Sequence, residues 1–134
     1  MNVARGFAAC LLLATLVGCT REQDYYDVAR DRQAAMEELV EILVSIKDPG
    51  SMADAKRTLQ SNAEKYDTIA KRANALPKPP PQRVLEQLAQ DSALADATLR
   101  RAAIEAKRVG ELPGGAEFLR QFQSTKGLMS AVQK

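Results

Sequence analysis

Apolar residues recur at every third or fourth position along most of the chain after residue 24, and this spacing predicts amphipathic helices. Three turn signals divide the pattern, at Asp48-Pro49-Gly50, in the proline-rich stretch 77–81 and in the stretch 110–115, which contains glycine and proline. No segment shows the alternation of apolar and polar residues that is typical of strands. We therefore expect helices at about 24–47, 51–76, 82–109 and 116–132, with Ser51 capping the second.

Each predicted helix carries one apolar stripe. The stripe positions are Tyr25, Val28, Ala35, Leu39, Ile42 and Ile46 in the first helix, Met52, Ala55, Leu59, Tyr66, Ile69, Ala73 and Leu76 in the second, Leu85, Leu88, Ser92, Ala95, Leu99, Ala102, Ala106 and Val109 in the third, and Phe118, Phe122, Thr125, Met129 and Val132 in the fourth. Helices of this kind bury the stripe against neighbours at shallow crossing angles. The pattern predicts an all-α, antiparallel three- to four-helix bundle.

Two polar residues interrupt these stripes, Arg32 in the first helix and Asn62 in the second. We expect them to mark the open edge of a small bundle, although a buried polar group can also fix the register between helices. The prolines of 77–81 are best explained as a rigid connection between two long helices rather than as a ligand for a peptide-binding module.

Charge favours pairing of the first two helices. Residues 21–48 hold four basic and eight acidic side chains, whereas residues 51–82 hold six basic and three acidic ones. Complementary charge helps to select the partner and the register, although each exposed ion pair stabilises little. The acidic cluster Glu37, Glu38 and Glu41 is predicted to be a solvated helix face rather than a cation site.

The first nineteen residues follow a different pattern. Arg5 precedes an apolar run from Gly6 to Val17, and the small residue Gly18 comes directly before Cys19. The run is about 12 residues long, whereas a membrane-spanning helix needs roughly 20. This order of basic, apolar and small residues predicts a secretory signal peptide.

The sequence Leu16-Val17-Gly18-Cys19 resembles the lipobox of bacterial lipoproteins. The resemblance implies that a dedicated signal peptidase recognises Leu16, Val17 and Gly18, and that the Cys19 thiol carries a diacylglyceryl group, usually with a third acyl chain on the new amino terminus. It further implies a signal peptide at 1–18, a lipid-anchored tether at 19–23, and a bundle at 24–134 held on the membrane through the acyl chains on Cys19. Two or more acyl chains suffice for stable anchoring.

Two further inferences depend on this anchor. Thr20 occupies the position where, by resemblance, an aspartate marks retention at the inner membrane, which indicates the outer membrane, with the protein facing the periplasm. Tyr25 and Tyr26 lie six and seven residues after Cys19 and permit two interpretations. They contact the membrane interface, where tyrosine is favoured, or Tyr25 begins the apolar stripe of the first helix.

The amino-acid composition excludes several kinds of catalytic and metal-binding site. The chain has no histidine and no tryptophan, and the loss of Cys10 with the signal peptide leaves only the lipidated Cys19. Such a mature chain has no Cys/His zinc site, no Ser-His or Cys-His dyad and no disulfide. The nearly equal numbers of basic and acidic residues give no support to a nucleic-acid partner. We expect no catalytic residue, no metal and no cofactor.

Beyond the signal segment, the pattern of helix, proline tract and helix loosely resembles small helical envelope lipoproteins, and this likeness implies no active site. We expect a non-enzymatic, lipid-anchored structural or protein-interaction module of the envelope, whose partner is another envelope protein or a second copy. The alternative is a module that binds a small apolar or lipidic ligand between the helices, in a cavity lined by Leu99, Ile69 and Phe118.

Overall fold

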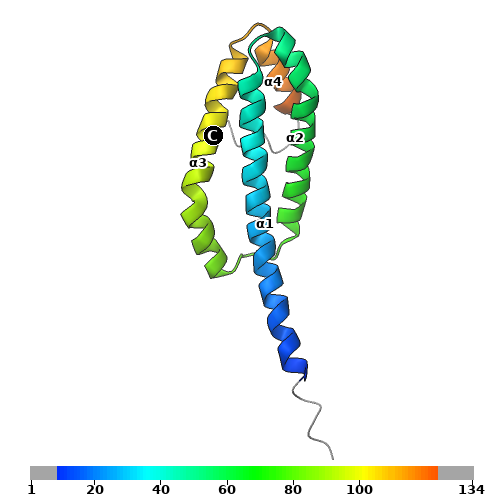
Figure 1. Cartoon of the computed structure of the whole chain (residues 1–134), viewed down its shortest axis with the longest axis vertical. Coiled ribbons are helices and arrows are strands. Elements are labelled where there is room, and N and C mark those ends of the chain that lie inside the picture. Colours follow the sequence, from blue (N-terminus) through cyan, green and yellow to red (C-terminus); the bar gives the residue numbers. More distant parts are fainter. Residues whose placement is uncertain (1–8, 124–134) are drawn as a thin grey trace, which may run out of the picture.

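The computed structural model describes the backbone of residues 9–123 and the side chains of residues 21–122. Four helices follow one another: α1 (Ala9–Ser45), α2 (Pro49–Ala75), α3 (Gln82–Gly110) and α4 (Gly115–Gln123). The three long helices run antiparallel, and the N-terminal part of α1 continues past the ends of α2 and α3 (Figure 1). All regular structure in the described residues is helical, which confirms the predicted all-α bundle.

Two helix starts differ from the prediction. The first helix begins at Ala9 rather than near residue 24, because no proline or turn signal separates the apolar run from the stripe that follows. The second begins at Pro49, and Asp48 rather than Ser51 is its N-cap. The amide of Ser51 donates to Asp48 Oδ1 (2.8 Å), while the amide of Asp48 donates to Ser51 Oγ (2.9 Å), so these two residues form a reciprocal capping box.

The short α4 begins after Gly114, whose φ of 79° lies in the left-handed region that favours glycine. The predicted helix at 116–132 is described as far as Gln123, and its positions Thr125, Met129 and Val132 lie outside the described residues. Phe118 and Phe122 are both buried, and their ring centroids are 5.3 Å apart in an edge-to-face arrangement.

The core lies where α1 meets the other long helices. Among the described elements, α1 packs against α2 and α3, and α4 packs against the same two helices, but α2 and α3 do not pack against each other. The predicted stripes of α1 and α2 are buried along most of their length. The largest fully buried side chains are those of Leu39, Val40, Leu43, Ile46, Leu59, Asn62, Val84 and Val109.

The third stripe is buried only in its second half. Ala102, Ala106 and Val109 are buried, whereas Leu85 and Ala95 are exposed and Leu99 is half-buried. The prediction that this stripe packs throughout is therefore wrong. The reason is that α4 occupies the space between α2 and α3 only at the far end, so the first half of α3 has no neighbour on its α2 side.

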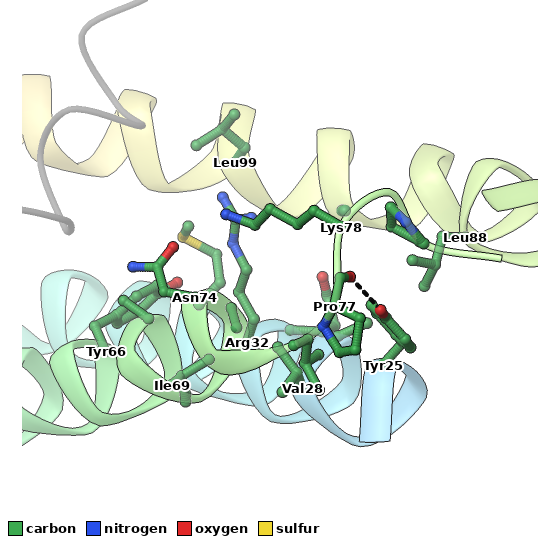
Figure 2. Close-up of a pocket in the computed structure, with 18 of the residues that line it drawn as sticks. Tyr25, Val28, Arg32, Tyr66, Ile69, Asn74, Pro77, Lys78, Leu88 and Leu99 are labelled. Atoms are coloured by element: carbon green, nitrogen blue, oxygen red, sulfur yellow. Dashed lines mark hydrogen bonds between the residues drawn. The ribbon is translucent and has the colours of Figure 1, made fainter. Parts of the chain in front are cut away.

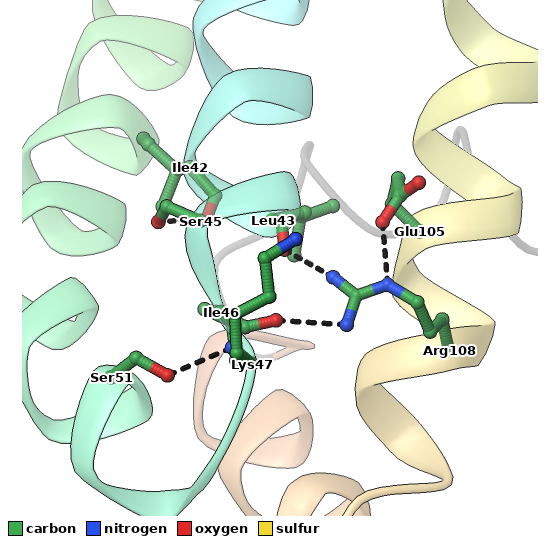
Figure 3. A network of polar contacts seen from close by, with 8 residues as sticks. All are labelled: Ile42, Leu43, Ser45, Ile46, Lys47, Ser51, Glu105 and Arg108. Carbon is green, nitrogen blue, oxygen red and sulfur yellow. Dashed lines mark hydrogen bonds and ion pairs between the residues drawn. The ribbon is translucent and has the colours of Figure 1, made fainter.

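Polar contacts fix the pairing of helices. Lys65 Nζ lies 2.6 Å from Glu38 Oε2, and Arg72 Nη1 lies 2.5 Å from Asp31 Oδ2, so two ion pairs join α2 to α1 as the charge pattern predicted. At the other interface, the guanidinium of Arg108 on α3 reaches the carboxyl end of α1 (Figure 3). It donates to the carbonyl oxygens of Leu43 (2.7 Å) and Ile46 (2.8 Å).

This contact caps a helix. The last carbonyl groups of an α-helix have no partners within the helix and carry the negative end of its dipole. Arg108 donates to the carbonyl group of Leu43 in the last turn of α1 and to that of Ile46 directly after it, while its Nε donates to Glu105 Oε2 at 2.7 Å. Within the part of the chain that the structure describes, no helix is both long and apolar enough to cross a membrane.

Candidate functional site: a cleft between the long helices

A cleft with a volume of about 730 Å³ lies between α1, α2, the connection after α2 and the first half of α3. Its walls are mostly apolar, and Val28, Ile69, Leu88 and Leu99 contribute to them from three helices (Figure 2). The cleft exists because α2 and α3 do not pack against each other there. The exposed half of the third stripe therefore faces open space rather than a neighbouring helix.

The cleft lies at the end of the bundle where α1 enters. Tyr25 and the connection from Leu76 to Pro80 bound it at that end. The Tyr25 hydroxyl donates a hydrogen bond to the carbonyl oxygen of Pro77, and the Tyr25 side chain is buried. Of the two interpretations of Tyr25, the structure supports its place in the apolar stripe. The proline-rich segment serves as the connection that its length predicted.

Two cationic side chains extend into this space. Arg32 projects from α1 toward α3, and Lys78 enters from the connection (Figure 2). Among the described residues, neither Arg32 nor Lys78 lies within 4.0 Å of a carboxylate, although the carboxylate of Asp96 on α3 also lines the cleft. Arg32 is exposed at the open side of the bundle, as predicted.

Tyr66 on α2 supplies a third polar group to the wall of the cleft. Its side chain is buried, and its hydroxyl has no hydrogen-bond partner among the described residues. Burial raises the pKa of Tyr66 to about 12, and the nearby positive charge of Arg32 acts in the opposite direction. The hydroxyl is therefore protonated at physiological pH and can donate a hydrogen bond.

The prediction that Asn62 marks an open edge of the bundle is wrong. This side chain is 0% exposed, in the seam between α1 and α2. Its Nδ2 donates to the carbonyl oxygen of Ala35 (3.0 Å) and to Glu38 Oε2 (3.3 Å), while its Oδ1 has no hydrogen-bond partner among the described residues. Asn62 thus joins a polar network between α1 and α2, and none of the residues in this network lines the cleft. The hydrogen bond from Lys65 lowers the pKa of Glu38 within the same network.

Two members of the acidic cluster, Glu38 and Glu41, approach cationic side chains, whereas Glu37 accepts a hydrogen bond from Gln33 Nε2 on the same helix at 2.8 Å. Glu38 binds Lys65, and Glu41 Oε1 lies 3.9 Å from Arg101 Nη2 on α3. In the described part of the chain, no group of three or more acidic or cysteine side chains gathers where a metal ion could be held. Glu38 and Glu41 therefore take part in contacts between helices.

The predicted site residues fall into two groups. Cys19 and its neighbours Leu16, Val17 and Gly18 belong to the N-terminal part of α1, and their side chains lie outside the described residues. Of the residues predicted to line a cavity, Leu99 and Ile69 do so. Phe118 does not, because it packs from α4 into the hydrophobic core.

Sequence reasoning missed Lys78 and the hydroxyl of Tyr66 as parts of the cleft. The interruption of the first stripe by Arg32 was the available signal, but it did not indicate which residues surround that position. No protein-family model, no curated protein and no solved structure matches the chain. What the cleft can bind therefore follows from its own dimensions and side chains.

Proposed function

We propose that this chain is a lipid-anchored protein of the bacterial cell envelope whose bundle binds an amphiphile in the cleft. The supporting observation is the cleft itself, with its volume of about 730 Å³ and mostly apolar walls. Sites for small molecules typically measure about 300–1,000 Å³ and combine apolar walls with a few polar groups. Here Arg32, Lys78 and Tyr66 are the polar groups.

The length of the cleft suits one acyl chain. Its lining residues on α1 run from Tyr25 to Met36, and eleven residues of helix extend over about 16 Å. The hydrocarbon core of a bilayer is about 30 Å thick, so one acyl chain spans roughly 15 Å. A single extended chain lying along α1 therefore fits the cleft.

The position of the cleft supports the same proposal. Cys19, the proposed point of lipidation, precedes Tyr25 by six residues in one continuous helix, a separation of about 9 Å along the axis. An anchor at Cys19 places the cleft next to the membrane surface. A ligand with an acyl chain then passes between membrane and protein with little exposure of its chain to water.

The structural or protein-interaction role is the second proposal. Two exposed apolar side chains on α3 favour a role in protein interaction. Leu94 is 60% exposed and Ile104 is 67% exposed. These two positions do not lie on one stripe, and single exposed apolar residues are common on soluble proteins. They therefore support a protein partner less strongly than the cleft supports a ligand.

Native mass spectrometry of the full lipidated chain, released from detergent, tests the first proposal. We expect a bound single-chain amphiphile on the wild-type protein. Ala95→Trp places a large side chain in the cleft and should abolish the adduct, whereas Ala97→Trp, on the same exposed helix but outside the lining, should retain it. A ligand-free dimer would favour the interaction module instead.

A further inference from the structure

Three residues with hydrogen-bond donors line the cleft from three different segments. Arg32 comes from α1, Tyr66 from α2, and Lys78 from the connection between α2 and α3. Arg32 lies close enough to Tyr66 for its charge to oppose the effect of burial on the Tyr66 pKa. Figure 2 shows the side chains of Arg32 and Lys78 extending into the same space between the helices.

Among the described residues, none of these three donors has an ion-pair or hydrogen-bond partner, and all three line one cleft. Six arginine and lysine side chains of the described residues form ion pairs: Arg30, Lys65, Arg72, Arg101, Arg108 and Arg120. Arg32 and Lys78 have no such partner within the part of the chain that the structure describes. The buried hydroxyl of Tyr66 also has no hydrogen-bond partner among the described residues, so it keeps an unused donor at the wall of the cleft.

The charges of the cleft favour a headgroup with one negative charge. Arg32 and Lys78 contribute two positive charges, and Asp96 contributes one negative charge. One positive charge therefore remains uncompensated within the cleft. A carboxylate balances that charge and matches the planar, forked donors of an arginine, whereas a neutral headgroup leaves it uncompensated.

We propose that the cleft binds a fatty acid, with its carboxylate held by Arg32, Lys78 and Tyr66 and its acyl chain along the apolar wall of α1. The inference rests on the proposed function, because it names the class of amphiphile that the same cleft takes. Arg32 and Lys78 select the headgroup, and Val28, Ile69 and Leu99 contact the chain.

Photolabelling with two probes of equal chain length tests this selection. The full lipidated chain is placed in phosphatidylcholine vesicles that contain a diazirine analogue of either hexadecanoic acid or hexadecanol, and labelled residues are mapped by mass spectrometry. We expect the acid to label the cleft at about one tenth of the concentration that the alcohol needs, since a hydrogen bond to a charged group is worth about tenfold or more in affinity.

The variants Arg32→Gln and Lys78→Gln remove charge at exposed positions and should each abolish most of this preference without reducing labelling by the alcohol. Arg100→Gln and Lys71→Gln are the matched controls. Both replace exposed cations that lie outside the cleft and form no ion pair among the described residues, so both should keep the preference.

Other results would overturn the inference. Equal labelling of the cleft by acid and alcohol, or a preference that survives Arg32→Gln and Lys78→Gln, contradicts recognition of the carboxylate and leaves the proposed binding of an amphiphile intact. Absence of cleft labelling by either probe contradicts the proposed function and this inference together.

Discussion

The hydroxyl of Tyr25 donates a hydrogen bond to the carbonyl oxygen of Pro77, which joins the start of the buried part of α1 to the connection between α2 and α3. The two residues are 52 positions apart in the sequence, and both line the cleft at the end near the proposed anchor. This contact therefore holds the connection, with Lys78, against α1. It determines where one end of the cleft lies.

Tyr25→Phe removes this hydrogen bond and keeps the aromatic ring. We expect it to lower the free energy of unfolding by about 1 kcal/mol, the usual contribution of one hydrogen bond. Urea titration followed by circular dichroism measures the change. Tyr26→Phe is the control, because the neighbouring hydroxyl makes no hydrogen bond with a described residue. Equal effects of the two variants would contradict the assigned role of Tyr25.

Stability at alkaline pH depends on Tyr66. Burial raises the pKa of this phenol in the folded chain to about 12, above the ordinary value of 10.0 that the unfolded chain retains. Tyr66 therefore contributes its full share of stability below pH 10, and this share, about 3 kcal/mol, is lost as the pH rises from 10 through 12. Urea titrations across this range should show the decline in the wild type, and Tyr66→Phe should remove that part of it.

Asn62 is the position where a small chemical change should cost the most stability. Asn62→Asp replaces the amide that donates to Ala35 with a carboxylate of the same shape, fully buried and next to Glu38. We expect a loss of about 3 kcal/mol or more in the free energy of unfolding at neutral pH, because a buried charge without a partner is strongly destabilising. Ser61→Asp, at the exposed neighbouring position, should change stability little. Similar midpoints for the two variants would contradict the buried network.

Arg108 provides a further test of the contact between helices. Arg108→Ala removes the donor to the carbonyl group of Ile46 and one of the two donors to that of Leu43, which also accepts from the amide of Ile46. We expect the free energy of unfolding to fall by about 2 kcal/mol, since a hydrogen bond donated by a charged group contributes more stability than one between neutral groups. Lys107→Ala is the control, because the exposed Lys107 forms no ion pair with a described residue. Stability that does not change in Arg108→Ala would show that the cap contributes nothing.

Those parts of the fold that depend on a local pattern of residues could be predicted from the sequence. Apolar spacing identified the helices and the buried faces of α1 and α2, and the prolines after Leu76 indicated the connection. Spacing shows which face of a helix is apolar but not whether another helix covers it. For this reason the first half of α3 was wrongly predicted to be packed, and Ala95 lies at the cleft instead.

The polar interruptions show the same difficulty. Arg32 and Asn62 break their stripes in the same way, yet one is exposed at the cleft and the other is buried. The difference arises from the neighbouring helices, because α1 covers Asn62 and supplies the carbonyl group of Ala35, whereas Arg32 faces the gap between α2 and α3. Such contacts between distant segments are not contained in the local pattern.

The most direct test of the central claim asks whether an acyl chain enters the cleft. The chain has no tryptophan, so one introduced residue reports without background. Leu88→Trp places the reporter on the cleft wall, and Leu94→Trp places it on the same helix outside the lining. Brominated hexadecanoic acid, added to the full chain in phosphatidylcholine vesicles, should quench the fluorescence of Trp at position 88 in a saturable manner and leave position 94 nearly unchanged. Equal quenching at both positions, or none at position 88, would contradict ligand binding in the cleft.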